Sequence, residues 1–451
     1  LVAAQLSARR RHLSRMDLVY RPLVTVDAGL DITRLRDQPL VDAVEIVVDG
    51  TADATHIVAG NSSHIEITPA ATADPATGNS DTPSVGLLNA IDIRSWNPKW
   101  FRPAPITDAV TLRQLTDGDG GRFTRPSVEN AHRAAAVMCD DHGSATAVAT
   151  ARTIAELAAT GAPLAGTVGD EVARLLGAPL AAAIGAVDAR TLYGATARER
   201  HSVLLRRLAQ HDFSPRGTWR RIGAATGAGV SAEPAVSVLL PSNRADDVIE
   251  AARQAATQRD VRVQLIVGLH GAHMSHDLDE QLADAFPGDL VVRHLPDEMN
   301  LGQVLNVLTD AADGELVSKW DDDDWYDRWH LNDLVAALEY SGAAMVAKAA
   351  EFVYLEAIDL TIRRFSTGSE RPSTTVAGGT LLLTRRDLER ARWAEAPRRV
   401  DRLLIDALEA TGRLTYRTHG LGYVLRRRGG ALGQHTWQAG DSYFLSQSQD
   451  Q

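Results

Sequence analysis

Four consecutive aspartates, residues 321–324, directly follow a short apolar segment that ends at Trp320. Adjacent carboxylates repel one another unless a cation or a solvated turn takes up their charge. Residues 315–320 have the composition of a buried strand, and parallel α/β sheets bind ligands at the carboxyl ends of such strands. Because carboxylate oxygens suit hard divalent cations, the pattern favours a metal bound together with substrate phosphates. An acidic turn or helix N-terminus without a ligand is the alternative.

Length and composition limit the class of protein. A chain of 451 residues is longer than one ordinary hydrophobic core supports, so we expect two domains, with a third small one as the alternative. The hydrophobic content of 44% and the charged content of 23% are typical of soluble globular proteins. The net charge of −11 argues against nucleic-acid binding, which needs a basic surface. The single cysteine, Cys139, excludes an internal disulfide and a cysteine-rich zinc site.

Targeting signals are weak in this sequence. We find no run of about 18 or more apolar residues and no signal-peptide pattern, so the sequence predicts a cytoplasmic protein. The basic segment 9–15 suits peripheral contact with anionic lipid at the inner face of the plasma membrane, and a solvated basic face is the alternative. The chain begins at Leu1 rather than Met, and we expect residues upstream of it.

The pattern of apolar and polar residues changes near the middle of the chain. Short apolar runs between Asp, Gly and Asn predict strands in residues 17–68, whereas residues 127–225 have Ala-rich helical periodicity. The glycines and proline of residues 226–234 predict a linker. After it, strand and helix patterns alternate, which predicts a mixed, mostly parallel sheet with flanking helices. We therefore expect a smaller α/β domain in residues 1–225 and a second α/β domain in residues 235–451.

The order of the motifs in residues 234–445 resembles a family 2 glycosyltransferase of the GT-A fold. Each motif is weak by itself, and their joint order carries the resemblance. Besides the aspartates, the matching segments are Pro241-Ser242-Asn243-Arg244, Asn300-Leu301-Gly302, Ala377-Gly378-Gly379-Thr380, Val400-Asp401-Arg402 and Gly433-Gln434-His435-Thr436-Trp437. The resemblance implies transfer of a sugar from a nucleotide-diphospho-sugar, with a UDP-sugar favoured, in the presence of Mn²⁺ or Mg²⁺.

The resemblance also assigns roles to particular residues. Asp321, Asp323 and the imidazole of His435 are expected to hold the metal, and Asp401 matches the catalytic base of inverting members. Such a base accepts the proton of the attacking sugar hydroxyl. The expected donor-binding residues are Pro241, Ser242, Asn243, Arg244, Asn300, Gly302, Asp321, Asp322, Gly378 and Gly379. The expected acceptor-binding residues are Trp325, Tyr326 and Trp437.

Each role has a structural alternative. Asp401 is also a suitable N-cap for the helix that follows it, and Arg244 is also an ordinary exposed arginine at a strand end. The pair Gly378 and Gly379 also suits a plain turn before a strand, and a lone histidine such as His435 is more often structural. The tryptophans and Tyr326 also suit core packing.

The sequence departs from the family pattern at two positions. Val400 stands where the family often has a glutamate before the base. The second strand ends in Gly268-Leu269-His270-Gly271, where acidic residues commonly contact the nucleotide base. The nucleotide, uridine or another, therefore stays open.

The amino-terminal half resembles a different fold more loosely. Residues 149–164 and 198–216 are similar to helix and loop elements of a GT-B glycosyltransferase, within about residues 85–225. The chain is too short for both Rossmann-like halves of a complete GT-B enzyme, so we predict a reduced, non-catalytic domain of Rossmann-like character. Glu156, which contacts the donor ribose in an active GT-B site, is expected here on a helix surface.

Three functions follow from these observations. The leading prediction is a metal-dependent, inverting glycosyltransferase that extends a cell-surface polysaccharide or glycoconjugate on a glycan or lipid-linked acceptor. A nucleotidyltransferase is the second, although its usual glycine-rich loop after the first strand is missing from residues 241–244. A catalytically inactive transferase-fold scaffold is the third. Donor sugar, acceptor, linkage and oligomeric state do not follow from the fold.

Overall fold

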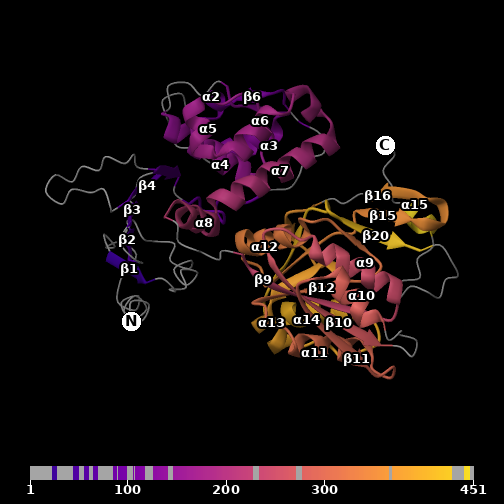
Figure 1. Ribbon diagram of the computed structural model, residues 1–451. Coiled ribbons are helices and arrows are strands. Elements are labelled where there is room, and N and C mark those ends of the chain that lie inside the picture. Colours follow the sequence, from indigo (N-terminus) through magenta and orange to yellow (C-terminus); the bar gives the residue numbers. More distant parts are fainter. Residues whose placement is uncertain are drawn as a thin grey trace. The chain divides into compact units, whose positions relative to one another are not determined.

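A computed structural model describes the larger part of the chain. The described residues are 23–27, 44–49, 55–59, 64–69, 85–88, 90–98, 105, 107–116, 125–140, 146–226, 233–270, 277–364, 368–428 and 441–446. The chain divides into two compact units, Leu1–Pro98 with Arg102–Ala232, and Glu233–Gln451 with Lys99–Phe101 (Figure 1). The division after Ala232 falls in the segment predicted as a linker. None of the described helices is long and apolar enough to cross a membrane.

The first unit begins with a five-stranded sheet whose strands follow the order of the sequence. β1 and β2 are parallel, and the later neighbours are antiparallel. The strands are β1 (Leu23–Asp27), β2 (Val44–Asp49), β3 (Thr55–Ala59), β4 (His64–Pro69) and β5 (Val85–Leu88). Among the described residues, β1 to β4 confirm the strand patterns predicted in residues 17–68, and the apolar run Leu18-Val19-Tyr20 lies outside the described residues.

The rest of this unit is a small parallel sheet with helices. Its order is β6-β7-β8, and all connections pass through helices, which is the crossover that parallel strands require. The strands are β6 (Val110–Thr111), β7 (Val137–Met138) and β8 (Leu164–Ala165). The helices are α2 (Leu112–Leu115), α3 (Arg125–Arg133), α4 (Ala147–Thr160), α5 (Asp170–Leu176), α6 (Ala178–Gly185), η3 (Ala189–Tyr193), α7 (Ala195–Phe213) and α8 (Pro215–Thr226). The expected α/β class of the smaller domain is confirmed.

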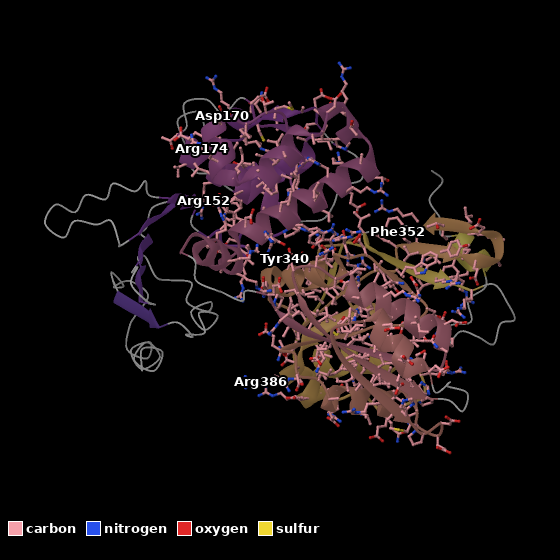
Figure 2. The ribbon with its side chains drawn as sticks, in the orientation of Figure 1. Arg152, Asp170, Arg174, Tyr340, Phe352 and Arg386 are labelled. Carbon is pink, nitrogen blue, oxygen red and sulfur yellow. The ribbon has the colours of Figure 1, made fainter. Side chains whose placement is uncertain are left out.

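The expectation of an exposed Glu156 is wrong. Glu156 is only 8% exposed, because α4 is buried on most of its faces, with α7 and α5 among its neighbours. Arg152, labelled in Figure 2, donates from Nε to Oε1 of Glu156 at 2.8 Å. Burial raises the pKa of Glu156, and the Arg152 guanidinium opposes that increase. Glu156 is therefore a buried partner of Arg152 within α4.

The second unit is built on an eight-stranded sheet of order β11-β10-β9-β12-β18-β14-β19-β17. The first four strands of this order are parallel, β18 is antiparallel to both of its neighbours, and β14 and β19 are parallel. The strands are β9 (Ala235–Ser242), β10 (Arg262–His270), β11 (Asp289–Leu295), β12 (Leu316–Lys319), β14 (Met345–Lys348), β17 (Arg371–Pro372), β18 (Leu381–Thr384) and β19 (Thr415–Thr418). The predicted mixed, mostly parallel sheet is confirmed.

Helices cover both faces of this sheet, and β9 at its centre is therefore a nearly continuous buried apolar run. The helices are α9 (Ala245–Ala256), α10 (Leu278–Ala285), α11 (Leu301–Asp310), α12 (His330–Ser341), α13 (Arg385–Ala391) and α14 (Val400–Ala410). One buried cluster joins Leu239 of β9 and Leu381 of β18 to residues of α11, α13 and α14. Register places Leu239, Lys319 and Leu381 side by side, so Lys319 points to the same face as α14.

A four-stranded sheet, β13-β20-β15-β16, adjoins the large one. Its strands are β13 (Trp325–Tyr326), β15 (Phe352–Leu355), β16 (Leu360–Arg363) and β20 (Tyr423–Arg427). Phe444 of α15 (Asp441–Leu445) is fully buried against Val353, Leu355 and Ile362 of this sheet. The short helix η4 (Glu356–Ile358) connects β15 to β16, and η5 (Gly378–Thr380) precedes β18.

The order of strands locates a binding crevice. From β9 the chain moves to β10 and β11 on one side, and then returns to β12 on the other side of β9. In open α/β sheets, ligands bind outside the carboxyl ends of the strands at such a reversal. The residues after β9 and after β12 are therefore those that the fold brings to a ligand site.

Candidate active site

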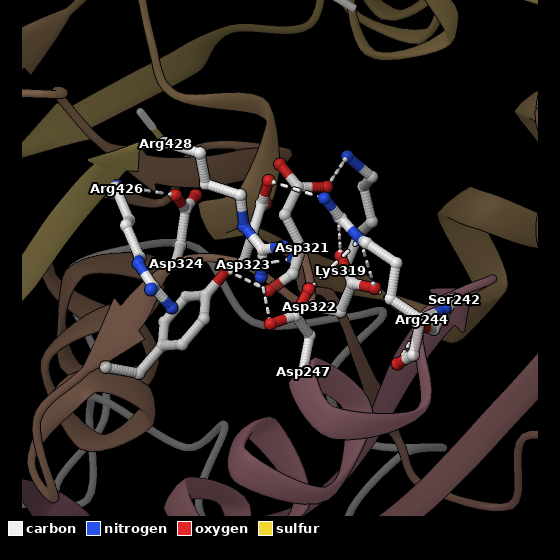
Figure 3. A network of polar contacts seen from close by, with 11 residues as sticks. Ser242, Arg244, Asp247, Lys319, Asp321, Asp322, Asp323, Asp324, Arg426 and Arg428 are labelled. Atoms are coloured by element: carbon white, nitrogen blue, oxygen red, sulfur yellow. Dashed lines mark hydrogen bonds and ion pairs between the residues drawn. The ribbon is translucent and has the colours of Figure 1, made fainter. Parts of the chain in front are cut away.

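The aspartates after β12 lie beside the end of β9, with β20 on their other side (Figure 3). Ser242 ends β9, and its hydroxyl donates to Oδ2 of Asp322 at 2.5 Å. Arg244 donates from Nε to the same oxygen at 3.2 Å and from Nη1 to Oδ2 of Asp323 at 3.1 Å. Its Nη2 pairs with the other oxygen of Asp322. Ser242 at the end of β9 and Arg244 directly before α9 thus compensate two of the four carboxylates.

The outer aspartates have other partners. Lys319 donates from Nζ to Oδ1 of Asp321 at 2.7 Å. Asp324 accepts from the Tyr423 hydroxyl at 2.6 Å and from the Arg426 amide at 3.0 Å. Asp324 is buried, and burial raises its pKa well above the usual value. Asp324 therefore joins the tetrad to β20 and is not open to a ligand.

The repulsion that the sequence presents is thus relieved within the protein. Each aspartate accepts from a cationic side chain, a hydroxyl or a backbone amide. The five partners come from β9, β12, β20 and the residue that precedes α9. Burial raises the pKa of Asp322, and the Arg244 guanidinium opposes that increase. A bound cation is therefore compatible with the tetrad but is not needed to hold it together.

Asp401 lies at the same place, although it is far away in sequence. Its Oδ1 is 3.2 Å from Nζ of Lys319, so one ammonium contacts both Asp321 and Asp401. Burial raises the pKa of Asp401, and Lys319 opposes the increase. Burial lowers the pKa of Lys319, but the two carboxylates raise it above its usual value, so the side chain stays charged.

The helix-cap alternative for Asp401 is wrong. Asp401 is the second residue of α14, and the N-cap is Arg399, at φ 62° and with no side-chain cap bond. A carboxylate in the first turn is still favoured by the helix dipole. The side chain of Asp401 is 29% exposed, so it combines a charged partner inside with access from outside.

Gly378 and Gly379 lie directly against the two acids that Lys319 contacts. A Cβ added to Gly378 would come within 2.2 Å of Oδ2 of Asp401, and one added to Gly379 within 2.7 Å of Oδ2 of Asp321. Real Cβ atoms do not approach oxygen so closely, so a larger residue at either position would displace the neighbouring carboxylate. The groups next to these glycines are the site carboxylates, and donor binding by Gly378 and Gly379 stays a prediction.

Three of the expected donor-binding residues, Asn300, Gly302 and Pro241, have local structural roles. Asn300 caps α11, where its side chain accepts from the Gln303 amide at 3.1 Å. A Cβ on Gly302 would meet the carbonyl oxygen of Ala394 at 1.9 Å, so Gly302 allows α11 to pack on that loop. Pro241 is buried inside β9, whereas Asn243 is exposed directly after it.

The expected acceptor residues divide between the two faces of β13. Tyr326 is only 5% exposed, stacks on Trp320 at 3.9 Å between ring centroids and donates to the carbonyl of Gly379 at 2.9 Å. Its assignment to the acceptor is therefore wrong, because successive strand residues face opposite sides and Tyr326 faces the core. Trp325 is 36% exposed and stacks on Tyr354. Trp437 and His435 lie outside the described residues.

The acids are chemically suited to a divalent cation. Oxygen ligands are those that Mg²⁺ and Mn²⁺ prefer, and the side chains of Asp321 and Asp323 are 39% and 15% exposed. Within the described residues, no group of three or more His, Cys, Asp or Glu side chains is arranged to hold a metal ion. Asp321 and Asp323 already accept from Lys319 and Arg244, so a cation bound by these oxygens would replace one of those contacts.

Lys319 is the residue of this site to which the sequence analysis assigns no role. Its signal is present, since a lysine inside an otherwise apolar strand is buried only when it is paired. Its side chain is 3% exposed, and its two partners come from the next loop and from α14. Tyr423 is another residue of this site without a role in the sequence analysis, because its partner Asp324 is remote in sequence.

Comparison with known proteins gives matches in solved structures alone. No family model matches the chain, and no curated protein matches it. The chain is similar to TarS 1-349 of S. aureus, at 15% identity over 42% of this chain and 60% of that one, with a TM-score of 0.33.

Two further solved structures extend this comparison. Mannosyltransferase PcManGT from Pyrobaculum calidifontis, in complex with GDP-Man and Mn²⁺, is 17% identical over 46% of this chain and 60% of that one, with a TM-score of 0.35. Glucosyl-3-phosphoglycerate synthase from Mycobacterium tuberculosis, in complex with Mn²⁺, UDP and phosphoglyceric acid, is 19% identical over 44% of this chain and 72% of that one, with a TM-score of 0.32. The chain thus spans less than two thirds of the TarS and PcManGT structures.

Proposed function

We propose that the second unit is a glycosyltransferase that moves a sugar from a nucleotide-diphospho-sugar to a hydroxyl of a glycan or lipid-linked acceptor. The observation that carries the proposal is the contact of Lys319 with both Asp321 and Asp401, at 2.7 and 3.2 Å. Lys319 thereby holds two acids together. Asp321 lies at the reversal of strand order, where ligands bind in such sheets, and Asp401 is suited to accept a proton. A UDP-sugar is the donor that we favour.

The residues suggest how the transfer proceeds. Asp401 accepts the proton of the acceptor hydroxyl while the oxygen of that hydroxyl forms the new bond to the anomeric carbon. The bond from that carbon to the diphosphate oxygen breaks at the same time, and the electron pair leaves with the nucleoside diphosphate. One displacement of this kind inverts the anomeric centre. Lys319 keeps Asp401 in place and stabilises its ionised form.

Asp321 and Asp323 are the residues that would hold Mn²⁺ or Mg²⁺. When bound, such a cation neutralises the charge that grows on the leaving diphosphate. Arg244, the N-cap residue of α9, offers a planar guanidinium that suits phosphate oxygens. Trp325, the exposed member of β13, is the described residue that we assign to the acceptor.

The inactive scaffold is a second candidate that one observation favours. The tetrad already has internal partners for its charge, so it is stable without a ligand.

For the amino-terminal unit we propose a role in organising the acceptor or a partner rather than in catalysis. A cell-surface acceptor and a cytoplasmic place of action are likewise proposals from the sequence.

A donor panel tests the function. We expect one nucleotide sugar to bind in the presence of Mn²⁺ and to be hydrolysed slowly, measured by calorimetry and by chromatography of the released nucleotide. Asp323→Ala should weaken this Mn²⁺-dependent binding about tenfold, because one charged oxygen ligand is lost. Asp284→Ala, at an exposed position of α10, is the matched control and should bind normally. No binding by any donor would favour the scaffold.

Gly378→Ala is expected to lower the rate of donor hydrolysis about tenfold while the protein stays folded. The added Cβ would lie 2.2 Å from Oδ2 of Asp401 and so displace the base from Lys319, and small displacements of this kind reduce rates strongly. Gly185→Ala is the control, since its Cβ meets only an ordinary contact at 3.9 Å. Hydrolysis rates and thermal unfolding of both variants give the comparison. A normal rate in Gly378→Ala would contradict the role of Asp401.

A further inference from the structure

Arg244 contacts two neighbouring aspartates with different parts of its guanidinium (Figure 3). Nε and Nη2 form a paired contact with the two oxygens of Asp322, with Nε at 3.2 Å from Oδ2. Nη1 donates to Asp323 Oδ2 at 3.1 Å. Bidentate pairing fixes the plane of a guanidinium, whereas a single contact can be exchanged without moving that plane.

The two contacts differ in their surroundings. The Asp322 side chain is 5% exposed and also accepts from the Ser242 hydroxyl, and Asp247 adds a second carboxylate 3.2 Å from Nε of Arg244. The Asp323 side chain is 15% exposed, and that of Arg244 is 31% exposed. The inner edge of the guanidinium is therefore held by two carboxylates, those of Asp322 and Asp247. The edge that carries Nη1 lies toward the more open side.

The outer edge also lies where two kinds of ligand would compete. Asp323 offers an oxygen to a divalent cation, and Nη1 offers a hydrogen to a phosphate oxygen. While Nη1 and Asp323 are paired, each group blocks the other from its ligand. Separating them removes one partner from each group, and a cation at Asp323 together with a diphosphate at Nη1 replaces both partners.

We propose that Arg244 couples the binding of a divalent cation to the binding of a nucleoside diphosphate. Without ligands, Nη1 holds Asp323. When both ligands bind, Nη1 donates to a phosphate oxygen, Asp323 turns to the cation, and the pair with Asp322 stays in place. This inference rests on the proposed function, because it takes a nucleoside diphosphate as the ligand of the crevice.

The coupling predicts changes of opposite sign when Arg244 is removed. Arg244→Met removes one competitor for Asp323, so Mn²⁺ alone should bind about threefold to tenfold more tightly, as expected for a partly exposed ion pair. UDP alone should bind about tenfold more weakly, because a charged donor to phosphate is lost. Coupling between two ligands is reciprocal, so the enhancement of Mn²⁺ binding by UDP should fall by the same factor as that of UDP by Mn²⁺.

The experiment measures these affinities on the full chain, with Mn²⁺ detected by electron paramagnetic resonance and UDP by calorimetry, each with and without the other ligand. Arg244→Lys is the second variant, since it keeps the charge but has no planar fork to contact Asp322 and Asp323 together. It should reduce the coupling with a smaller change in stability than Arg244→Met. Arg253→Met on α9 is the control, because its side chain is 63% exposed and pairs only at 3.5 Å with Glu250.

The outcomes separate this inference from the proposed function. Tighter Mn²⁺ binding with weaker UDP binding in Arg244→Met supports the coupling, even if no nucleotide sugar is ever hydrolysed. Equal or weaker Mn²⁺ binding in Arg244→Met and in Arg244→Lys overturns it, as does a failure of wild type and variants to bind Mn²⁺ at all. Donor hydrolysis by the wild type would leave the proposed function standing in those cases.

Discussion

Asp401→Asn is expected to lower the rate of sugar transfer about 10²- to 10⁴-fold with little change in donor affinity. A positioned general base contributes a factor of this size, and asparagine has the same shape but accepts no proton. Lys319 holds the carboxylate in place at 3.2 Å, so the variant loses chemistry rather than position. The measurement is the turnover number and the Michaelis constant of the donor found in the panel.

The pH dependence gives this prediction a second readout. The base acts when it is ionised, so the rate falls as pH decreases through the pKa of Asp401. Burial raises that pKa, and Lys319 opposes the increase, so the loss should begin at a higher pH than for an ordinary aspartate. Asp401→Asn should lack this acidic limb, whereas the control Asp406→Asn, at a half-exposed position on the same helix, should retain it. An unchanged limb in Asp401→Asn would assign the base elsewhere.

Lys348→Met is expected to destabilise the second unit by about 3–5 kcal/mol, as breaking one partner of a buried pair does. The side chains of Lys348 and Asp333 are 0% and 1% exposed, with Nζ at 2.8 Å from Oδ2. His419 is also close, with Nε2 at 3.3 Å from the same oxygen. Removal of the ammonium leaves the Asp333 carboxylate buried with less compensation. Urea unfolding of the full chain measures the change.

A second substitution and a control test the cause. Lys348→Met combined with Asp333→Leu should recover much of the lost stability, because neither charge then remains buried. Arg402→Met removes a member of an exposed pair on α14, with side chains 44% and 45% exposed, and should cost less than about 1 kcal/mol. If Lys348→Met cost no more than Arg402→Met, the buried pair would not stabilise this unit.

The strands and helices of the second unit were accessible from sequence. Apolar runs and amphipathic repeats depend on neighbours along the chain, so the sequence predicts alternating strands and helices after the linker, and the structure has this alternation from β9 to β12. The position of the aspartates after a buried strand follows for the same reason. The exposure of Glu156 was mispredicted, because the burial of a helix face depends on what packs there.

The sequence by itself determined that acids, glycines and an arginine stand at the ends of buried strands, since strand ends and turns are local properties of the chain. Only the tertiary structure decided which of them meet. Sheet order brings β12 beside β9, which places Arg244 against Asp322 and Asp323. The packing of α14 on the same sheet places Asp401 against Lys319 and Gly378. The same packing turned Tyr326 into the core and left Trp325 outside. Contacts of this kind depend on distances across the sheet, and no pattern along the chain encodes those distances.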